Sequence, residues 1–274
     1  MVKVGGALDG DMSRACADIA ALAAGGTPVV VVHGGGAEAD RLGERLGIEK
    51  RYLTGSGGRR SRYTDAAQLD VLTLGMLGRV KPPLVETLLR LGVRAVGLSG
   101  IDGYLVTALK TGPARAEVDG VTRVVRDDLT GRIAAVDPHL LYTLLAAGYT
   151  PVVSPPALDP AVGPLNVDAD RCAAAIATAL SAASLVILSN VPGLLADKDD
   201  PASLVTSLPV SSLPSYLDLA HGRMKVKVRA AAEAHLAGVP TVVLADGRHD
   251  SPVRAALAGA GTHIVTRERH VRAS

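Results

Sequence analysis

Short apolar runs alternate with longer amphipathic segments along most of the chain. Each run is rich in valine, isoleucine or leucine and ends in glycine, asparagine, serine or aspartate, which is typical of buried β-strands. The runs cover residues 1–6, 28–36, 94–100, 150–156, 184–193 and 240–247. Because successive positions in them are apolar, rather than every second one, we predict a mostly parallel sheet that is covered on both faces.

The segments between these runs carry apolar residues at helical spacing. We predict helices over residues 13–24, 37–46, 66–77, 83–91, 138–147, 170–183 and 224–237. Residues 103–136 differ, because "YLVTALKT" and "TRVVRDD" alternate apolar and polar positions and flank turn residues. This pattern predicts antiparallel hairpins at one side of the sheet.

The composition narrows the classes of function. A chain of 274 residues can form one large α/β domain or two small ones. Its formal net charge of only +2 argues against a general polyanion binder, and the absence of Phe and Trp argues against base stacking on single-stranded nucleic acid. We therefore expect no nucleic-acid partner.

The chain shows no sign of export or of membrane insertion. "MVKVGG" is broken by glycine too early for a signal peptide, and no apolar run approaches the ~20 residues that span a bilayer. Cys16 and Cys172 lie in apolar helical patterns without metal-ligand spacing, so we expect buried thiols. A cytoplasmic protein without membrane contact is the expectation.

Three of the predicted strands end in glycine-rich segments, "KVGG", "HGGG" and "LSGIDG". At the carboxyl ends of parallel strands, glycines let an anion approach the backbone and helix N-termini offer free N–H groups. One such segment alone is as consistent with a tight turn, but their repetition at one sheet edge favours an anion site. His33 begins one of them, and we expect it to orient that loop by hydrogen bonding. The chain contains no Walker A, GxGxxG, HExxH or CxxC motif, so no protein-bound metal is indicated.

Taken together, the motifs resemble those of the amino acid kinase family. The segments are "KVGG", "HGGG", "SRYTD", "GLSGIDG", "NVDAD", "SNVPGLL", "GRMKVKV", "ADGR" and "GAGT". Their order and spacing are similar to the acetylglutamate kinase branch over essentially the whole chain. The resemblance implies the carbamate kinase-like fold, an open αβα sandwich with a mostly parallel central sheet. Residues 1–180 would bind the amino-acid substrate and a second subunit, and residues 181–274 would bind ATP, with one sheet running through both.

The resemblance also implies the catalytic residues. Members of the family phosphorylate a carboxylate that is already ionised at neutral pH, so they need positive charge around the phosphoryl group rather than a general base. The two catalytic lysines correspond to Lys3 and Lys227, and the aspartate that holds them corresponds to Asp170. Local sequence alone leaves Lys3 as a strand-edge charge, Asp170 as a helix-start acid and Lys225 as a rival of Lys227.

The remaining site residues follow from the same motifs. For the substrate they are Gly34, Gly35, Gly36, Arg62 and Asn166, and for the phosphates they are Gly5 and Gly6. For the nucleotide they are Ser189, Asn190, Gly193, Leu195, Lys198 and Met224, with Asn190 in place of the family's more usual aspartate. Mg²⁺ would be bound mainly by the ATP phosphates and water, as is normal for this ion.

The segment "KRYLTGSGGRRSRYTD" holds more arginines than a small substrate requires. Arg59 and Arg60 precede Arg62, and Arg51 lies nearby. This version of the loop is similar to that of kinases acting on glutamate or α-aminoadipate attached to a small acidic amino-group carrier protein of the LysW type. The three arginines are the expected carrier dock. A solvated loop, with arginines favoured by coding bias, is the plain alternative.

Two other functions remain open from the sequence. One is a kinase for free N-acetyl-L-glutamate in arginine biosynthesis, and the other is a non-catalytic nucleotide-binding sensor, against which the three catalytic-type residues speak. We expect a homodimer joined through N-terminal-half helices. Because the first strand begins at residue 1 or 2, we expect no N-terminal helix of the kind that links arginine-inhibited relatives into hexamers.

Overall fold

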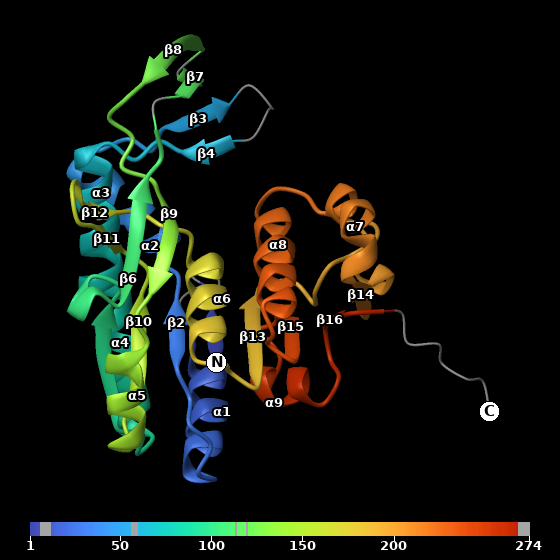
Figure 1. The fold of residues 1–274 in the computed structure, drawn as a ribbon. Helices are drawn as coiled ribbons and strands as arrows, with labels where there is room; N and C mark the ends of the chain where they lie inside the picture. The colour runs from blue at the N-terminus through green and yellow to red at the C-terminus, as the bar shows by residue number, and fades with distance from the viewer. Residues whose placement is uncertain (6–11, 56–59, 113, 119, 268–274) are drawn as a thin grey trace.

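An eight-stranded sheet runs through the whole molecule in the computed structural model (Figure 1). The structure describes residues 1–5, 12–55, 60–112, 114–118 and 120–267. In spatial order the strands are β14 (Ser207–Pro209), β16 (Thr262–Val265), β15 (Thr241–Asp246), β13 (Ser184–Ser189), β1 (Val2–Val4), β2 (Val31–His33), β10 (Thr150–Ser154) and β5 (Ala95–Ser99). All neighbours are parallel except β15 and β16, as the apolar runs predicted.

Helices cover both faces of this sheet. One face carries α1 (Ser13–Ala24), α4 (Lys81–Arg90) and α9 (Pro252–Leu257), and the other carries α5 (His139–Ala146), α6 (Ala169–Ala179) and α8 (Arg223–Leu236). Side chains alternate between the two cores, because Leu185 and Ile187 of β13 join one cluster while Val186 and Leu188 join the other. Burial on both faces explains why the strands are apolar at successive positions.

The N-terminal part holds a longer helical stretch than predicted. α2 (Gly36–Leu46) follows β2, and α3 (Ala66–Leu74) passes through a π-helical turn, Gly75–Val80, directly into α4. The predicted break between residues 77 and 83 is therefore wrong. The prolines at 82 and 83 lie in the first turn of α4, where a missing N–H removes little bonding.

Two smaller four-stranded sheets contain the predicted hairpins. One has the order β12 (Gly163–Leu165), β11 (Ala157–Asp159), β6 (Val106–Lys110) and β9 (Gly131–Val136). The other has the order β4 (Arg60–Arg62), β3 (Tyr52–Gly55), β7 (Ala114–Val118) and β8 (Val121–Val125). The second sheet projects from the top of the molecule in Figure 1, and we call it the lobe. The arginine-rich segment is thus partly strand, because β3 and β4 pair on either side of residues 56–59.

The C-terminal part contains short elements that the hydrophobic pattern did not indicate. They are β14, β16, α7 (Leu213–Leu219) and α9. Short 3₁₀ turns occur at Asp102–Tyr104, Pro201–Ser203 and Val210–Ser212. The thiols of Cys16 and Cys172 are both buried, as predicted. Among the described residues, no helix is both long and apolar enough to cross a membrane.

Candidate active site

Lys3 lies in the middle of the central strand β1. Its neighbours Val2 and Val4 point into the core beneath α1, so alternation along the strand directs Lys3 to the opposite face, beside α6. The residue is only 4% exposed. An ammonium group buried in this way requires a counter-charge, and the first turn of α6 supplies it.

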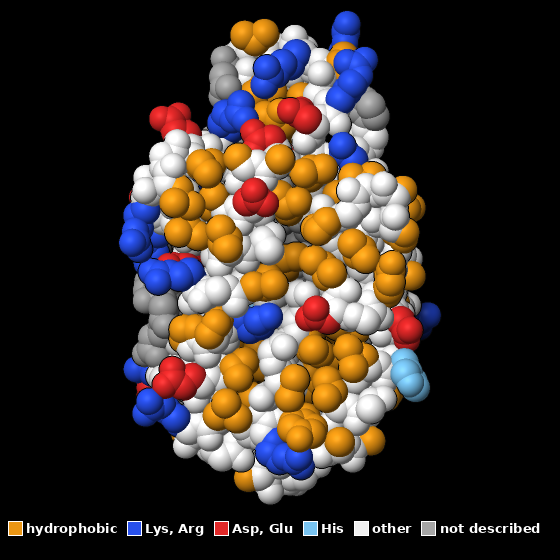
Figure 2. All heavy atoms as spheres, turned by 90° about the vertical axis from the view of Figure 1, so that its left-hand side faces the viewer, with side chains coloured by type: hydrophobic (Ala, Val, Ile, Leu, Met, Phe, Trp, Pro, Cys, Tyr) orange, Lys and Arg blue, Asp and Glu red, His pale blue; other side chains and the backbone are white. Residues whose placement is uncertain are grey.

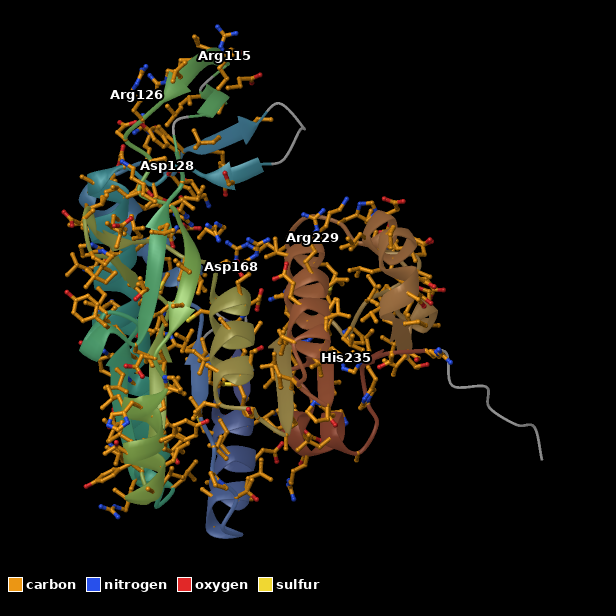
Figure 3. All side chains as sticks on the ribbon, in the orientation of Figure 1. Arg115, Arg126, Asp128, Asp168, Arg229 and His235 are labelled. Atoms are coloured by element: carbon orange, nitrogen blue, oxygen red, sulfur yellow. The ribbon has the colours of Figure 1, made fainter. Side chains whose placement is uncertain are left out.

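Asp170 joins Lys3 to Lys227. It follows Asp168, which begins α6 by accepting hydrogen bonds from the backbone N–H groups of Asp170 and Arg171, both at 3.0 Å (Figure 3). Lys3 Nζ lies 2.6 Å from Asp170 Oδ1. Lys227 Nζ, reaching across from α8, lies 3.1 Å from Oδ1 and 2.9 Å from Oδ2. The three side chains therefore meet at one point.

Two ammonium groups and one carboxylate give this group of three side chains a net charge of +1. Burial alone would raise the pKa of Asp170, but the two ammonium groups outweigh it and hold the pKa at about 2. Burial, helped by the charge of Lys3, lowers the pKa of Lys227 to about 8 against the opposing pull of Asp170. Two cations sharing one carboxylate are suited to receiving a further anion.

The glycines at the sheet edge have different roles. A side chain on Gly5 would meet Leu188 O at 2.8 Å, so its glycine is required by the packing of β13; Gly6 lies outside the described residues. The N–H of Gly34 donates to Val4 O at 3.0 Å and extends the sheet, so this amide is already hydrogen-bonded, and a substrate contact of Gly34 stays a prediction. Gly35 and Gly36 are the N-cap and first residue of α2, positions whose N–H groups have no partner within the helix.

His33 ties the glycine loop to its neighbouring strand. Nδ1 donates to Gly34 O at 2.8 Å, which leaves Nε2 to accept from Ser154 Oγ at 2.7 Å. Burial lowers the pKa of His33 to about 4, so the ring is neutral at physiological pH. The expected hydrogen bond to the loop is present.

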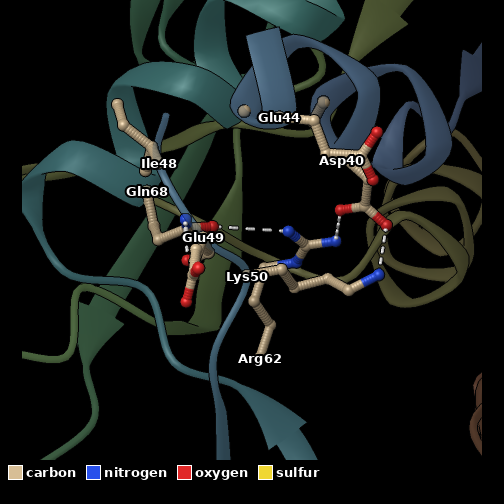
Figure 4. Close-up of a pocket in the computed structure, with 9 residues that line it drawn as sticks. Asp40, Glu44, Ile48, Glu49, Lys50, Arg62 and Gln68 are labelled. Atoms are coloured by element: carbon tan, nitrogen blue, oxygen red, sulfur yellow. Dashed lines mark hydrogen bonds and ion pairs between the residues drawn. The ribbon is translucent and has the colours of Figure 1, made fainter. Parts of the chain in front are cut away.

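Arg62 lies against the first turns of α2. It bonds to Asp40 Oδ1, and its Nη1 lies 3.4 Å from Gln68 Oε1 (Figure 4). Asp40 also accepts from Lys50 Nζ at 2.8 Å, so two cations share this carboxylate as well. The group borders a cavity of about 270 Å³, lined by Ala39, Asp40, Gly43, Glu44, Ile48, Glu49, Lys50, Arg62 and Gln68.

Asn166, which follows β12, is hydrogen-bonded to the segment after β4. Its Nδ2 donates to Thr64 Oγ1 at 3.1 Å. Its backbone is fixed on both sides, because its N–H donates to Leu129 O and its carbonyl accepts from Gly131. The side-chain amide is thus held against Thr64, which lies two residues after Arg62 in the sequence.

The nucleotide candidates lie at the end of β13 and in the segment after it. Ser189 is buried, and its Oγ donates to Val191 O at 3.3 Å, while Asn190 is exposed. Gly193 is required by packing, because a Cβ there would meet Thr262 Oγ1 at 2.5 Å.

The other nucleotide candidates are spread more widely. Leu195 forms an isolated bridge with Leu204. Lys198 is exposed and pairs with Asp199 at 2.6 Å. Met224 packs in the first turn of α8, three residues before Lys227. The structure brings Ser189 and Asn190 to the sheet edge and leaves Lys198 at the surface.

Arg51 makes two contacts with residues that follow β4, and its side chain is 34% exposed. It pairs with Asp65, and its guanidinium carbon lies 4.6 Å from the centre of the Tyr63 ring. These contacts fix the Arg51 side chain, and its part in a carrier dock stays a prediction. Arg59 and the side chain of Arg60 lie outside the described residues.

Sequence reasoning missed two charged residues of this region. Asp40 orients Arg62, and nothing in its local sequence distinguishes it from a surface acid of α2. Arg223 is the first residue of α8, and its spacing of four residues from Lys227 places both on one face of the helix. The four-residue spacing from Lys227 is visible in the sequence and could have indicated Arg223 as a site residue.

Known proteins match this chain over most of its length. The model of the Amino acid kinase family matches residues 1–246. The chain is 44% identical to a LysW-aminoadipate kinase of Deinococcus radiodurans, covering 96% of this chain and 90% of that one. It is 45% identical to a LysW-aminoadipate kinase of Thermus thermophilus, covering 96% and 99%. An acetylglutamate kinase of Symbiobacterium thermophilum is 37% identical, covering 90% and 84%.

Solved structures show the same fold. Carbamate kinase from Giardia lamblia, bound to AMP-PNP, superposes with a TM-score of 0.67 at 15% sequence identity, covering 97% of each chain. The expected carbamate kinase-like fold is therefore confirmed.

Proposed function

Because this chain belongs to the amino acid kinase family, we propose that it transfers the γ-phosphoryl group of ATP to the side-chain carboxylate of carrier-linked α-aminoadipate or glutamate. The carrier would be a small acidic amino-group carrier protein of lysine or arginine biosynthesis, and the products would be an acyl phosphate and ADP. The proposal rests on one observation, the contact of Lys3 and Lys227 with Asp170 beside the central strand β1.

The chemistry follows from the charges at this point. The substrate carboxylate is ionised at neutral pH, so its oxygen can attack the γ-phosphorus without a general base. The bond from that phosphorus to the bridging oxygen breaks, and ADP leaves with the electron pair. Lys3 and Lys227 would stabilise the negative charge on the transferring group, and Asp170 would keep both ammonium groups in place.

We assign the substrate to residues 1–180 and ATP to residues 181–274. Arg62 would bind a substrate carboxylate, Asn166 its amide portion, and Ser189 and Asn190 would lie beside the nucleotide. Both oxygens of Asp170 are already taken by ammonium groups, which suits Mg²⁺ bound by phosphates and water rather than by this residue. The ion would offset part of the phosphate charge.

Turnover with three substrates tests the proposal. ADP release would be measured with carrier-linked aminoadipate, carrier-linked glutamate and free N-acetyl-L-glutamate, each at saturating ATP. We expect turnover on a carrier-linked substrate and little on the free one. Turnover on free N-acetyl-L-glutamate alone would replace the proposal with acetylglutamate kinase, and ATP binding without any turnover would indicate a sensor.

The lobe supports the proposed carrier partner. Its described part exposes Arg115, Arg123 and Arg126 on and beside the β7–β8 hairpin (Figures 2 and 3). Positive charge on a projecting surface attracts an acidic protein and orients it before contact. Arg59 and Arg60 belong to the same lobe by sequence, between β3 and the end of β4.

We expect Arg59→Ala/Arg60→Ala to raise KM for the carrier-linked substrate about tenfold at low ionic strength, because it removes electrostatic attraction. The effect should shrink as salt shortens the Debye length below ~10 Å. Steady-state kinetics across a salt series measures this. Arg90→Ala, which removes an exposed arginine of α4 paired with Glu86, is the control. Equal losses on free and carrier-linked substrates would rule out the dock.

We also propose a homodimer joined through helices of residues 1–180. Figure 2 looks onto a side of the molecule where hydrophobic side chains gather. Leu74, Leu91 and Tyr142 of this half are 57%, 46% and 48% exposed, and a second subunit packed on this side would cover them.

Light scattering should therefore give twice the mass of one chain. Leu74→Glu should shift the protein toward the monomer, because a charge buried without a partner opposes association. Leu236→Glu, at a 67% exposed position of α8, serves as the matched control and should leave the mass unchanged. A wild-type monomer, or a hexamer, would refute this assembly.

A further inference from the structure

Arg223 occupies a position that the proposed chemistry has not yet used. It begins α8, one helical turn before Lys227, so the two side chains leave the same face of the helix. Its side chain is exposed, and no carboxylate of the described residues pairs with it. Lys225, which lies between the two in sequence, projects from another face of α8.

The guanidinium group of Arg223 extends to the N-terminal half of the molecule. A Cβ built on Gly36 would lie 3.3 Å from Arg223 Nη2, 3.8 Å from Arg223 Nη1 and 3.9 Å from Arg62 Nη2. Both arginines therefore approach one point, Arg62 from β4 and Arg223 from α8. The missing side chain of Gly36 leaves the space in which they converge.

Positive charge at this point exceeds the negative charge available to it. Arg62 shares Asp40 with Lys50, so two cations already compete for one carboxylate. Arg223 adds a third cation without adding an acid. Like charges gathered in this way repel one another unless an anion lies between them. A carboxylate is well matched, because guanidinium groups bind its two oxygens in a planar fork.

We propose that Arg223 is a substrate-binding residue which, together with Arg62, holds the substrate carboxylate that is not phosphorylated. This inference rests on the proposed function and adds a residue from the nucleotide half to the substrate site. Aminoadipate and glutamate each have two carboxyl groups, separated by a distance comparable with one helical turn of about 5.4 Å. Lys227 would meet the reacting end, and Arg223, one turn away, would meet the other.

Substitution at Arg223 tests the assignment. Arg223→Ala should raise KM for carrier-linked aminoadipate about ten- to a hundredfold, the usual range for losing a hydrogen bond between charged groups. KM for ATP should stay within about twofold. Arg223→Lys keeps the charge but loses the planar pair of N–H donors, so its KM for the carrier-linked substrate should lie between those of Arg223→Ala and wild type. Lys225→Ala, a cation removed from the same turn of α8, should have no such effect.

Three further measurements distinguish a shared substrate carboxylate from the γ-phosphate of ATP as the group that Arg223 binds. If Arg62 and Arg223 hold the same group, the losses in the double variant will be smaller than the product of the single losses. With the α-carboxylate of the substrate converted to an amide, wild type and Arg223→Ala should bind about equally. Calorimetric titration of the substrate without ATP should show the same weakening as KM.

The outcomes distinguish this inference from the function on which it rests. If Arg223→Ala raises KM for ATP, and the loss in the double variant equals the product of the single losses, Arg223 binds the phosphates of ATP and the inference is overturned. Unchanged kinetics in Arg223→Ala, with active wild type and inactive Lys227→Ala, would overturn the inference and leave the proposed function intact. Absence of wild-type turnover on every N-linked dicarboxylate would refute the proposed function itself.

Discussion

Replacing Lys227 by alanine is expected to lower kcat by about a hundredfold or more, because it removes a cation that would stabilise the transferring phosphoryl group. Lys3→Ala should have an effect of the same order, since both ammonium groups contact Asp170. The nucleotide dissociation constant should change much less, because charge develops on the transferred group mainly in the transition state. Single-turnover kinetics and equilibrium binding measure the two quantities separately.

Lys225→Ala is the control for this prediction. It removes a cation from the same "KVK" alternation, yet of these two lysines only Lys227 contacts Asp170 in the described part of the chain. We expect nearly normal turnover in Lys225→Ala. Near-wild-type turnover in Lys227→Ala together with a large loss in Lys225→Ala would reverse the assignment, and normal turnover in both would refute it.

Asp170→Asn is expected to lower activity about a hundredfold near neutral pH and to change its pH dependence. Lys227 has a pKa of about 8, so in wild type its ammonium form is present below that pH and is lost as the pH rises through it. The wild-type value of kcat/KM, which reports the free enzyme, should therefore fall above about pH 8. Without Asp170, Lys3 and Lys227 repel each other uncompensated, and the pKa of Lys227 falls further.

The alkaline limb of kcat/KM should consequently move to lower pH in Asp170→Asn. The matching limb of kcat in wild type should lie at higher pH than that of kcat/KM, because bound phosphates favour the ammonium form. Rate profiles between pH 6 and pH 10 measure all three limbs. If the alkaline limb of kcat/KM does not move in Asp170→Asn, a group other than Lys227 is titrating. The control Lys225→Ala should leave this limb at its wild-type pH.

Much of the fold could be predicted from local sequence. Residues 185–188, for example, are apolar at every position, as expected of a strand that is buried on both faces. The misplaced elements are those with weak local signals. The strands β14 and β16, with three and four residues, are too short for a pattern, and their pairing to each other and to β15 defines them.

The continuous helix from α3 to α4 shows a different limit. The glycines and prolines of residues 75–83 predict a break by their propensities, but Met76 and Leu72 are buried against α2. Packing on both sides of the π-helical turn outweighs the local preference. The arginine-rich segment was similarly expected to be a loop, and the pairing of β3 with both β4 and β7 made strands of its ends.

The sequence by itself determined which residues can carry the chemistry and roughly where each lies. Alternation in β1 directs Lys3 away from the Val2 and Val4 core, and the helix start at Asp168 places Asp170 in a first turn. Only the tertiary structure decided which charges meet. The packing of α8 against α6 brings Lys227, rather than Lys225, to Asp170. Arg51 pairs with Asp65, and Arg223 lies near Arg62 beside Gly36. Such choices depend on contacts between residues far apart in the chain, and local propensity and periodicity contain no information about them.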